Sequence, residues 1–222
     1  MLQLITTGDG SKTLFNPEIG ENYHSKHGAL QESRHVFLKS GLVFFLSANP
    51  VKTVHVLEIG FGTGLNFLLT AEYCTQNQIQ LHYTGIEAFP LSETLIAATD
   101  YNQYISPEIW ESFLHIYPDS LTRQQNLNNC VQLQIAHTSL LNFKSHNFFD
   151  VLYFDAFAAV HQPEMWTNEA LSSACTNLKK GGVFVTYAIT GNLKRSMKSL
   201  GFGIEKAPGA PGKREMLRAT KL

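Results

Sequence analysis

The chain has 222 residues, of which 44% are hydrophobic and 16% are charged, and it carries a formal net charge of −1. This composition is typical of a soluble globular protein, and no apolar run reaches the roughly 18 residues that a membrane span requires. The first residues show no basic segment followed by an apolar stretch and a cleavage site, so no secretory signal is expected and the cytoplasm is the expected location.

The cysteine and histidine patterns argue against a disulfide framework and against a metal site. Cys74, Cys130 and Cys175 are far apart and show no C-x-x-C spacing. Of the nine histidines, only His24 and His27 lie close together, and they lack the spacing and the further ligand of a helical zinc motif. We therefore expect no metal and no disulfide.

Short apolar runs alternate with segments of helical pattern from residue 54 onward. In chain order, we expect a strand over 54–59, a helix after Thr63, a strand over 81–87, and helical structure over 91–117 that breaks at Pro107 and ends near Pro118. There follow strands over 131–135 and 150–155, a helix over 163–178 that stops at Gly181 and Gly182, a strand over 182–189 and a helix over 191–200. The chain then has two segments, 202–206 and 214–220, joined by the turn P-G-A-P-G.

This order of elements predicts an α/β fold. Strands that are separated by helices form parallel βαβ units, whereas the last two segments, joined by a short turn, should pair antiparallel. We expect a doubly wound, mostly parallel sheet with an antiparallel C-terminal strand, formed by residues 51–222, and an N-terminal extension over residues 1–50. Ligands of such sheets bind at the carboxyl ends of the strands.

Residues 57–66, L-E-I-G-F-G-T-G-L-N, place three glycines at alternate positions between the first of these strands and its helix. Glycine allows a tight turn and lets a ligand approach the backbone, while a helix N-terminus offers unpaired N–H groups. The G-x-G-x-G spacing differs from the G-x-G-x-x-G of dinucleotide-binding folds, because Leu65 stands where that pattern has its third glycine. A tight turn without a ligand also explains a loop of this kind.

The pattern E-x-G-x-G-x-G resembles motif I of the class I S-adenosylmethionine-dependent methyltransferases. The resemblance implies a Rossmann-like fold of that class and S-adenosylmethionine as the cofactor, with the loop against its amino-acid portion. The residues implied in cofactor binding are Glu58, Gly60, Gly62, Gly64 and Asn66.

Glu87 ends the second strand, where a carboxylate can accept hydrogen bonds from both ribose hydroxyls of the cofactor. An exposed acid at a strand end is the alternative for this residue taken alone. The third strand is followed by Ala136, His137 and Thr138 rather than by the aspartate that often contacts adenine, so the adenine contact is unassigned.

The sequence F-D-A-F at 154–157 ends the fourth strand, where class I methyltransferases carry residues that face the acceptor and the transferable methyl group. Methyl transfer is an in-line displacement, so the nucleophile must be aligned and its developing charge accommodated. A carboxylate suits an amine, because it orients the N–H groups, stabilises the cationic product and accepts the released proton. We expect Asp155 to be catalytic and to contact the cofactor, with Phe157 and Trp166 as walls of the acceptor pocket, although both aromatic residues also fit core positions.

Further blocks resemble the tRNA wobble-uridine methyltransferase family, which comprises MnmD and the N-terminal half of MnmC. In chain order, they are E-S-R-H-V-F-L at 32–38, E-I-G-F-G-T-G-L-N-F at 58–67, D-A-F-A at 155–158, Q-P-E-M-W-T at 162–167, T-Y-A-I-T-G at 186–191 and P-G-A-P-G-K-R-E-M at 208–216. The resemblance implies methylation of the exocyclic amine of 5-aminomethyl-2-thiouridine in tRNA, which gives the 5-methylaminomethyl form.

The same resemblance implies the partners. The substrate is the anticodon loop of tRNA, and its base must be splayed out to reach a buried methyl group. The bifunctional relatives carry a flavin oxidoreductase half after this domain, whereas this chain stops at Leu222, so a separate enzyme is expected to supply the aminomethyl-uridine precursor. Two positions depart from the family pattern, because Ala159 replaces a frequent proline and Thr190 replaces a frequent lysine near the substrate.

The last fifth of the chain is basic. Residues 1–178 contain 7 Lys and Arg against 16 Asp and Glu, whereas residues 179–222 contain 10 against 2. A basic edge on an acidic body can hold a polyanion, although a solvated face explains it equally well. The candidates for phosphate contacts are Lys194, Arg195, Lys198, Lys213, Arg214 and Arg218.

Three of the candidate residues are assigned to substrate binding. Tyr23 belongs to an N-terminal stretch similar to the family segment that folds back over the cofactor and acceptor pocket. Lys213 and Arg214 are the expected RNA contacts, and Arg214 is equally a structural ion-pair partner. Two other functions stay open: a transferase for a small-molecule amine, which the overall acidity favours but which does not need the basic segment, and a non-catalytic RNA-binding module of the same fold.

Overall fold

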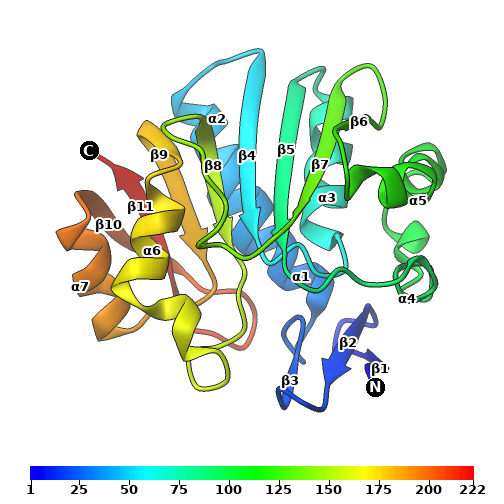
Figure 1. Cartoon of the computed structure of the whole chain (residues 1–222), viewed down its shortest axis with the longest axis horizontal. Coiled ribbons are helices and arrows are strands. Elements are labelled where there is room, and N and C mark those ends of the chain that lie inside the picture. The colour runs from blue at the N-terminus through cyan, green and yellow to red at the C-terminus, as the bar shows by residue number, and fades with distance from the viewer.

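The computed structural model describes residues 1–222, and Figure 1 shows a twisted sheet with helices on both faces. Eight strands form this sheet in the order β10-β11-β9-β8-β4-β5-β7-β6. Their bounds are β4 Thr53–Ile59, β5 Gln80–Glu87, β6 Gln125–Asn126, β7 Val131–His137, β8 Phe149–Phe154, β9 Leu178–Thr186, β10 Phe202–Pro208 and β11 Glu215–Lys221. A separate three-stranded sheet consists of β1 Gln3–Thr6, β2 Lys12–Asn16 and β3 Glu21–Asn22.

Seven α-helices connect the strands. They are α1 Ala29–Glu32, α2 Phe44–Ala48, α3 Leu65–Gln76, α4 Glu93–Ala97, α5 Pro107–Ser120, α6 Asn168–Cys175 and α7 Gly191–Ser199. A π-helical segment, Ser33–Val43, joins α1 to α2 without a break, and 3₁₀ turns cover Tyr101–Gln103 and Pro163–Trp166. No helix is both long enough and apolar enough to span a membrane.

The central strands are parallel, as the alternation of strands and helices predicts. β4 lies between β5 and β8, β7 pairs with β5, and β9 pairs with β8, all in parallel register. β11 runs antiparallel between β9 and β10. The predicted doubly wound sheet with an antiparallel C-terminal strand is therefore confirmed.

Successive residues of the central strands enter two separate cores, because strand side chains alternate between the two faces of a sheet. On β4, Val54 and Val56 join the core formed with α3 and α5, whereas Leu57 and Ile59 join the core formed with α6 and α7. Glu58 lies on the same face as Val56 and is fully buried next to α3. This placement of an acid in the core is explained by the site described below.

The helical structure over 91–120 is interrupted before Pro107, close to the expected break, but it does not end at Pro118. α4 and α5 are separate helices joined through a 3₁₀ turn, and α5 begins at Pro107, where the missing proline N–H has no partner to lose. α5 passes through Pro118 to Ser120. Pro118 lies in the last turn, so the helix tolerates the loss of its N–H there.

The bounds of β9 and α6 also differ from expectation. β9 starts at Leu178 and ends at Thr186, so Gly181 and Gly182 lie within a strand instead of separating a helix from one. Gly181 has φ +78°, and the pairing with β8 shifts register near it, which is the geometry of a bulge. α6 starts only after Thr167, whose hydroxyl oxygen accepts the Ala170 N–H at 3.2 Å.

The N-terminal segment is tied to the rest of the molecule at the start of α1. Gly28 offers no capping side chain, and the turn over residues 7–11 supplies the acceptors instead. The N–H groups of Ala29, Leu30 and Gln31 donate to Thr7 Oγ1, Ser11 Oγ and Asp9 Oδ2 at 3.2, 3.1 and 2.9 Å. The helical residues 29–48 pack against α3, β8 and β9. In Figure 1, β1–β3 lie below the carboxyl ends of the parallel strands.

Candidate active site

Two adjoining cavities lie at the carboxyl ends of the parallel strands. The larger has a volume of about 820 Å³ and is lined by the glycine loop, the ends of β4 and β5, and the residues after β8. The smaller has a volume of about 310 Å³ and lies between the N-terminal segment, the end of β9 and the turn between β10 and β11. Tyr23, His24, Ala156 and Phe157 line both, so the two cavities meet at the first residues after Asp155.

The three glycines of the loop after β4 are required by the backbone. Gly60, Gly62 and Gly64 have φ values of +83°, +53° and +79°, which residues with a Cβ rarely adopt. A Cβ on Gly60 would lie 2.5 Å from the Asp155 carbonyl oxygen, and one on Gly62 would lie 3.1 Å from the Tyr23 ring. The glycines thus bring the loop against the protein's own active-site residues, and residues 60–63 of the loop line the large cavity. The N–H groups of Gly60, Phe61, Gly62 and Gly64 are bonded within the protein.

Glu87 lies at the end of β5, in the wall of the large cavity. Its Oε2 accepts the Gly62 N–H at 3.0 Å and its Oε1 accepts the Phe89 N–H at 2.9 Å. Each oxygen keeps a second lone pair, so the carboxylate can also accept from a ligand hydroxyl. Glu87 thus lies beside the glycine loop, as the sequence predicts. Its role in binding the ribose stays a prediction.

Asp155 follows β8 and is held by a chain of buried polar groups. Asn66 Nδ2 donates to Asp155 Oδ2 at 2.8 Å and to Glu58 Oε1 at 2.7 Å, while Tyr83 donates its hydroxyl to Glu58 Oε2 at 2.7 Å. Glu58 and Asn66 line neither cavity. Glu58 and Asn66 fix the orientation of Asp155, and their expected role as cofactor contacts stays a prediction.

The protonation of Asp155 is shifted toward the neutral range. Burial raises the pKa of Asp155 to about 8, and the nearby Glu32 and Glu21 carboxylates add to this shift. The Asn66 hydrogen bond and the Lys213 ammonium act in the opposite direction. A carboxyl group with this pKa exchanges protons in the range in which an aliphatic amine must lose one to become nucleophilic.

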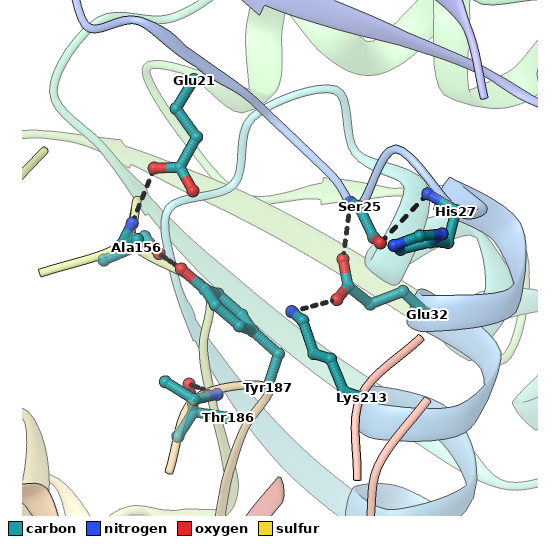
Figure 2. Close-up of polar contacts among 10 residues, drawn as sticks. Glu21, Ser25, His27, Glu32, Ala156, Thr186, Tyr187 and Lys213 are labelled. Carbon is teal, nitrogen blue, oxygen red and sulfur yellow. Dashed lines mark hydrogen bonds and ion pairs between the residues drawn. The ribbon is translucent and has the colours of Figure 1, made fainter. Parts of the chain in front are cut away.

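The backbone after Asp155 is fixed by side chains from three other parts of the chain. Glu21 Oε2 accepts the Ala158 N–H at 2.8 Å, and Tyr187 donates its hydroxyl to the Ala156 carbonyl at 2.9 Å (Figure 2). Trp166 Nε1 donates to the Phe157 carbonyl at 2.8 Å. These bonds set where the side chains of residues 155–157 point.

The two aromatic residues expected as walls of the acceptor pocket have different places. Phe157 lines both cavities and packs edge-on against Tyr23, with ring centres 5.1 Å apart. Trp166 lines neither cavity and packs against Phe154 and Tyr187. Trp166 holds the loop after Asp155 through its indole N–H, and its expected contact with the acceptor stays a prediction.

Lys213 lies inside the small cavity, not on an exposed basic face. Its Nζ is 2.7 Å from Glu32 Oε1 and 3.9 Å from the centre of the Tyr187 ring (Figure 2). The second oxygen of Glu32 accepts the Ser25 N–H at 2.8 Å. Glu32 is almost fully buried, so this ion pair joins the N-terminal segment to the turn between β10 and β11.

The other basic residues of the C-terminal segment divide into two groups. Arg218 stacks on Phe44 at 3.6 Å and forms an ion pair with Glu205 at 2.7 Å, so its role is structural. A structural ion pair was the alternative that the sequence left open for Arg214. Arg214 is exposed and has no ion-pair partner. Lys194, Arg195 and Lys198 lie on α7.

Four residues that line the small cavity were given no individual role from the sequence, namely Glu21, His24, Glu32 and Tyr187. His24 and Glu32 belong to the N-terminal stretch that was expected to fold back over the pocket. His24 is buried, its Nδ1 lies 2.8 Å from the Thr13 hydroxyl, and burial lowers its pKa to about 4, so the imidazole is neutral at neutral pH. Tyr187 directly follows β9, a position that the strand-end rule identifies. Glu21, His24 and Glu32 precede the sheet and carry no such positional signal.

The residues that line the large cavity suit S-adenosylmethionine. The acidic residues Glu18, Glu87, Asp155 and Glu164 line it, and it has no lysine or arginine in its wall, which favours a ligand that carries a sulfonium and an ammonium group. Apolar side chains of Ile86, Leu91 and Leu140 complete a wall suited to an aromatic ring.

The fold and this site define an S-adenosyl-L-methionine-dependent methyltransferase, and the sequence profile of that family matches residues 105–222. The chain belongs to this family, and S-adenosylmethionine is its cofactor. The resemblance to the MnmC group is also confirmed. The chain is 34% identical to the tRNA 5-methylaminomethyl-2-thiouridine biosynthesis bifunctional protein MnmC of Leptospira borgpetersenii, over 88% of this chain and 31% of that protein.

Two other relatives agree with this assignment. The MnmC protein of Methylobacillus flagellatus is 30% identical over 91% of this chain and 33% of its own length. The chain thus spans about a third of the length of these curated relatives. The crystal structure of MnmC2 from Aquifex aeolicus superposes with a TM-score of 0.79 at 22% identity, over 99% of this chain and 70% of that one, which shows the shared fold.

Proposed function

We propose that the protein methylates the exocyclic amine of 5-aminomethyl-(2-thio)uridine at the wobble position of tRNA and so forms 5-methylaminomethyl-(2-thio)uridine. The observation that carries the proposal is the position of Asp155, which lines the acidic large cavity directly before the residues shared with the small one. A carboxylate at this junction suits an amine acceptor better than a neutral hydroxyl. The names and motifs of the MnmC relatives support the choice of substrate.

In this scheme, bound S-adenosylmethionine supplies an electrophilic methyl carbon. The nitrogen–carbon bond forms as the carbon–sulfur bond breaks, and the amine gives up one proton. Asp155 orients the amine through its N–H groups and takes the proton, which its raised pKa permits near neutral pH. Asn66 keeps the carboxylate in place, and the bonds from Glu21 and Tyr187 keep its loop in place.

The proposal extends to tRNA as the partner. Phe157 and Tyr23 are aromatic residues shared by both cavities, and a base that is turned out of the anticodon loop can stack on such side chains. Lys26 and His27 line the small cavity and are exposed, so they meet the RNA backbone if the base enters from this side. A separate enzyme would supply the aminomethyl precursor, and a tRNA substrate would put the reaction in the cytoplasm.

The experiment that tests the proposal uses labelled S-adenosylmethionine and tRNA from cells that lack this methyltransferase. The RNA is digested to nucleosides, and the labelled nucleoside is identified by mass spectrometry. We expect the label in a 5-methylaminomethyl uridine, and a much lower rate of labelling with the Asp155→Asn variant. Binding of the cofactor without any labelled RNA would favour a transferase for a small-molecule amine or a non-catalytic RNA-binding module.

A further inference from the structure

The small cavity already holds one alkylammonium group, that of Lys213. This group lies between the Glu32 carboxylate, at 2.7 Å, and the face of the Tyr187 ring, at 3.9 Å (Figure 2). A carboxylate beside an aromatic face is the combination by which proteins recognise alkylammonium ions. The walls are therefore built for the protonated form of a primary amine.

Of the two charged partners, Glu32 is fixed and Lys213 is movable. The Glu32 side chain is 6% exposed, and its second oxygen is held by the Ser25 N–H. Lys213 is 33% exposed, and it reaches the cavity from the turn between β10 and β11 on a flexible four-carbon stem. Rotation of this stem moves the ammonium group out to solvent while the backbone stays in place.

Glu32 needs a cation at all times. A buried carboxylate that loses its ion-pair partner is strongly destabilised, so Lys213 leaves readily only when another cation takes its place. Two ammonium groups cannot share one carboxylate oxygen and one ring face, because their charges repel at that distance. A primary amine that enters the cavity as an ammonium ion therefore competes with Lys213.

Two carboxylates and two lysines line the small cavity, namely Glu21, Glu32, Lys26 and Lys213. Glu21 lines the small cavity together with Glu32, and both carboxylates raise the pKa of Asp155 while Lys213 opposes them. Lys213 is thus one cation among three interacting acidic groups. Because Lys26 is exposed, the buried Glu32 still needs a cation beside it when Lys213 leaves, and an incoming ammonium ion supplies that charge.

We propose that the small cavity is a binding site for a primary alkylammonium group, that Lys213 occupies this site in the free protein, and that the acceptor amine displaces Lys213 when it binds. Only the identity of that amine as the aminomethyl group of a uridine rests on the proposed function. The displaced Lys213 then lies next to the exposed Arg214 and is free to meet a phosphate. Entry of the amine and a contact to the RNA backbone are coupled in this way.

The first test measures the binding of ethylammonium chloride by thermal unfolding, without cofactor or RNA. The variants are Lys213→Met, which removes the internal cation, and the double variant Glu32→Gln/Lys213→Met, which removes both charges. If Lys213 fills the site about nine-tenths of the time, its removal raises the affinity for ethylammonium about tenfold over the wild type. For the double variant, ethylammonium chloride should shift the melting temperature no more than sodium chloride does. Equal shifts of the melting temperature by ethylammonium in the two variants would overturn the proposal.

The second test titrates the wild type, and a variant serves only to assign one NMR signal. The Tyr187 ring shifts the NMR signal of the Lys213 ε-methylene group, which is assigned in ¹³C-lysine-labelled protein by its absence in Lys213→Arg. We expect titration with ethylammonium to move this signal to the position of exposed lysines. A signal that does not move at saturating ethylammonium shows that Lys213 stays paired with Glu32, and this result overturns the proposal.

These outcomes separate the inference from the proposed function. Methylated tRNA together with a Lys213 signal that does not move contradicts the displacement and leaves the enzyme activity intact. Displacement by ethylammonium without methylated tRNA supports the ammonium site and removes tRNA as its substrate.

Discussion

At the scale of single residues, the orientation and the pKa of Asp155 depend on side chains that are distant in the sequence. Asn66 holds one of its oxygens, and Glu58 and Tyr83 orient Asn66 in turn. The environment raises the pKa of Asp155 to about 8, first by burial and then by the charge of Glu32. Fixed geometry and a proton exchange near neutral pH are the two properties that a general base needs.

The first prediction concerns the activity of Asp155→Asn. We expect turnover to fall by about 10² to 10⁴-fold, because the amide cannot take the proton of the amine. Cofactor affinity, measured by calorimetry, should change little, since the glycine loop and Glu87 are untouched. Asp119→Asn is the matched control, because Asp119 is exposed on α5. Turnover equal to that of the control would remove Asp155 from the reaction.

The second prediction concerns stability against pH for the same variant. The pKa of Asp155 is raised in the folded state, so its favourable contribution is complete below the unfolded value, near 3.8, and is lost as the pH rises through about 8. The amide that replaces the carboxyl group in the variant does not titrate. The melting temperature of Asp155→Asn relative to the wild type should therefore increase between about pH 4 and about pH 8 and then level off. A constant difference would mean that the pKa of Asp155 is not shifted.

Residue identities at strand ends were predictable, whereas their partners were not. Glu87 and Asp155 follow strands, so the carboxyl-end rule places them at the site. Glu32 and Lys213 are separated by 181 positions, and no local pattern indicates that they meet. Trp166 was expected in the pocket wall because aromatic side chains often line pockets, but the direction of a side chain depends on packing that a sequence does not show.

At the scale of elements, the segment after β8 is held by bonds from the 3₁₀ turn Pro163–Trp166, from the end of β9 and from β3. The order of strands and helices was predictable from their alternating patterns. The π-helical segment Ser33–Val43 has no such pattern. Gly41 in this segment packs so closely that a Cβ would lie 2.9 Å from the Tyr153 ring.

The third prediction tests the loop after Asp155 through Trp166→Phe. The variant keeps an aromatic ring against Phe154 but loses the hydrogen bond to the Phe157 carbonyl. Turnover should fall by roughly tenfold to a hundredfold, because small displacements of reacting groups cost this much, while stability changes little. Trp110→Phe in α5 is the matched control for loss of an indole in the core. A loss of stability without loss of turnover would assign Trp166 to packing alone.

The fourth prediction concerns the turn that caps α1. Asp9→Ala removes the acceptor for the Gln31 N–H, and we expect a loss of about 1–2 kcal/mol in the free energy of unfolding, measured in urea. Burial acts to raise the pKa of Asp9, but hydrogen bonds from Ser11, Gln31 and Thr7 outweigh it and hold the pKa below 3.8. The stabilisation is therefore present above that pH and is lost as the pH falls through the lowered pKa. A difference from the wild type that persists in strong acid would contradict this cause.

At the scale of the whole molecule, charge is divided between the two cavities. The large cavity is lined by carboxylates without a lysine or arginine, whereas in the small one Lys26, His27 and Lys213 accompany Glu21 and Glu32, and the exposed Arg214 adjoins Lys213 in the chain. A cationic cofactor and a polyanionic RNA are thus drawn to different sides of one site. This division orients the proposed tRNA with its backbone toward the N-terminal segment and the turn between β10 and β11.

The last prediction tests that orientation with the double charge reversal Lys26→Glu/Arg214→Glu. Each lysine or arginine that contacts a phosphate contributes about one unit to the salt dependence of RNA binding, so we expect weaker tRNA binding and a slope lower by about two units. Lys180→Glu is the matched control, because Lys180 is exposed near the amino end of β9, whereas the cavities lie at the carboxyl ends of the strands. If Lys180→Glu alone lowered the slope, the RNA would bind across the other edge of the sheet, and the acceptor amine could not reach Asp155 from that side.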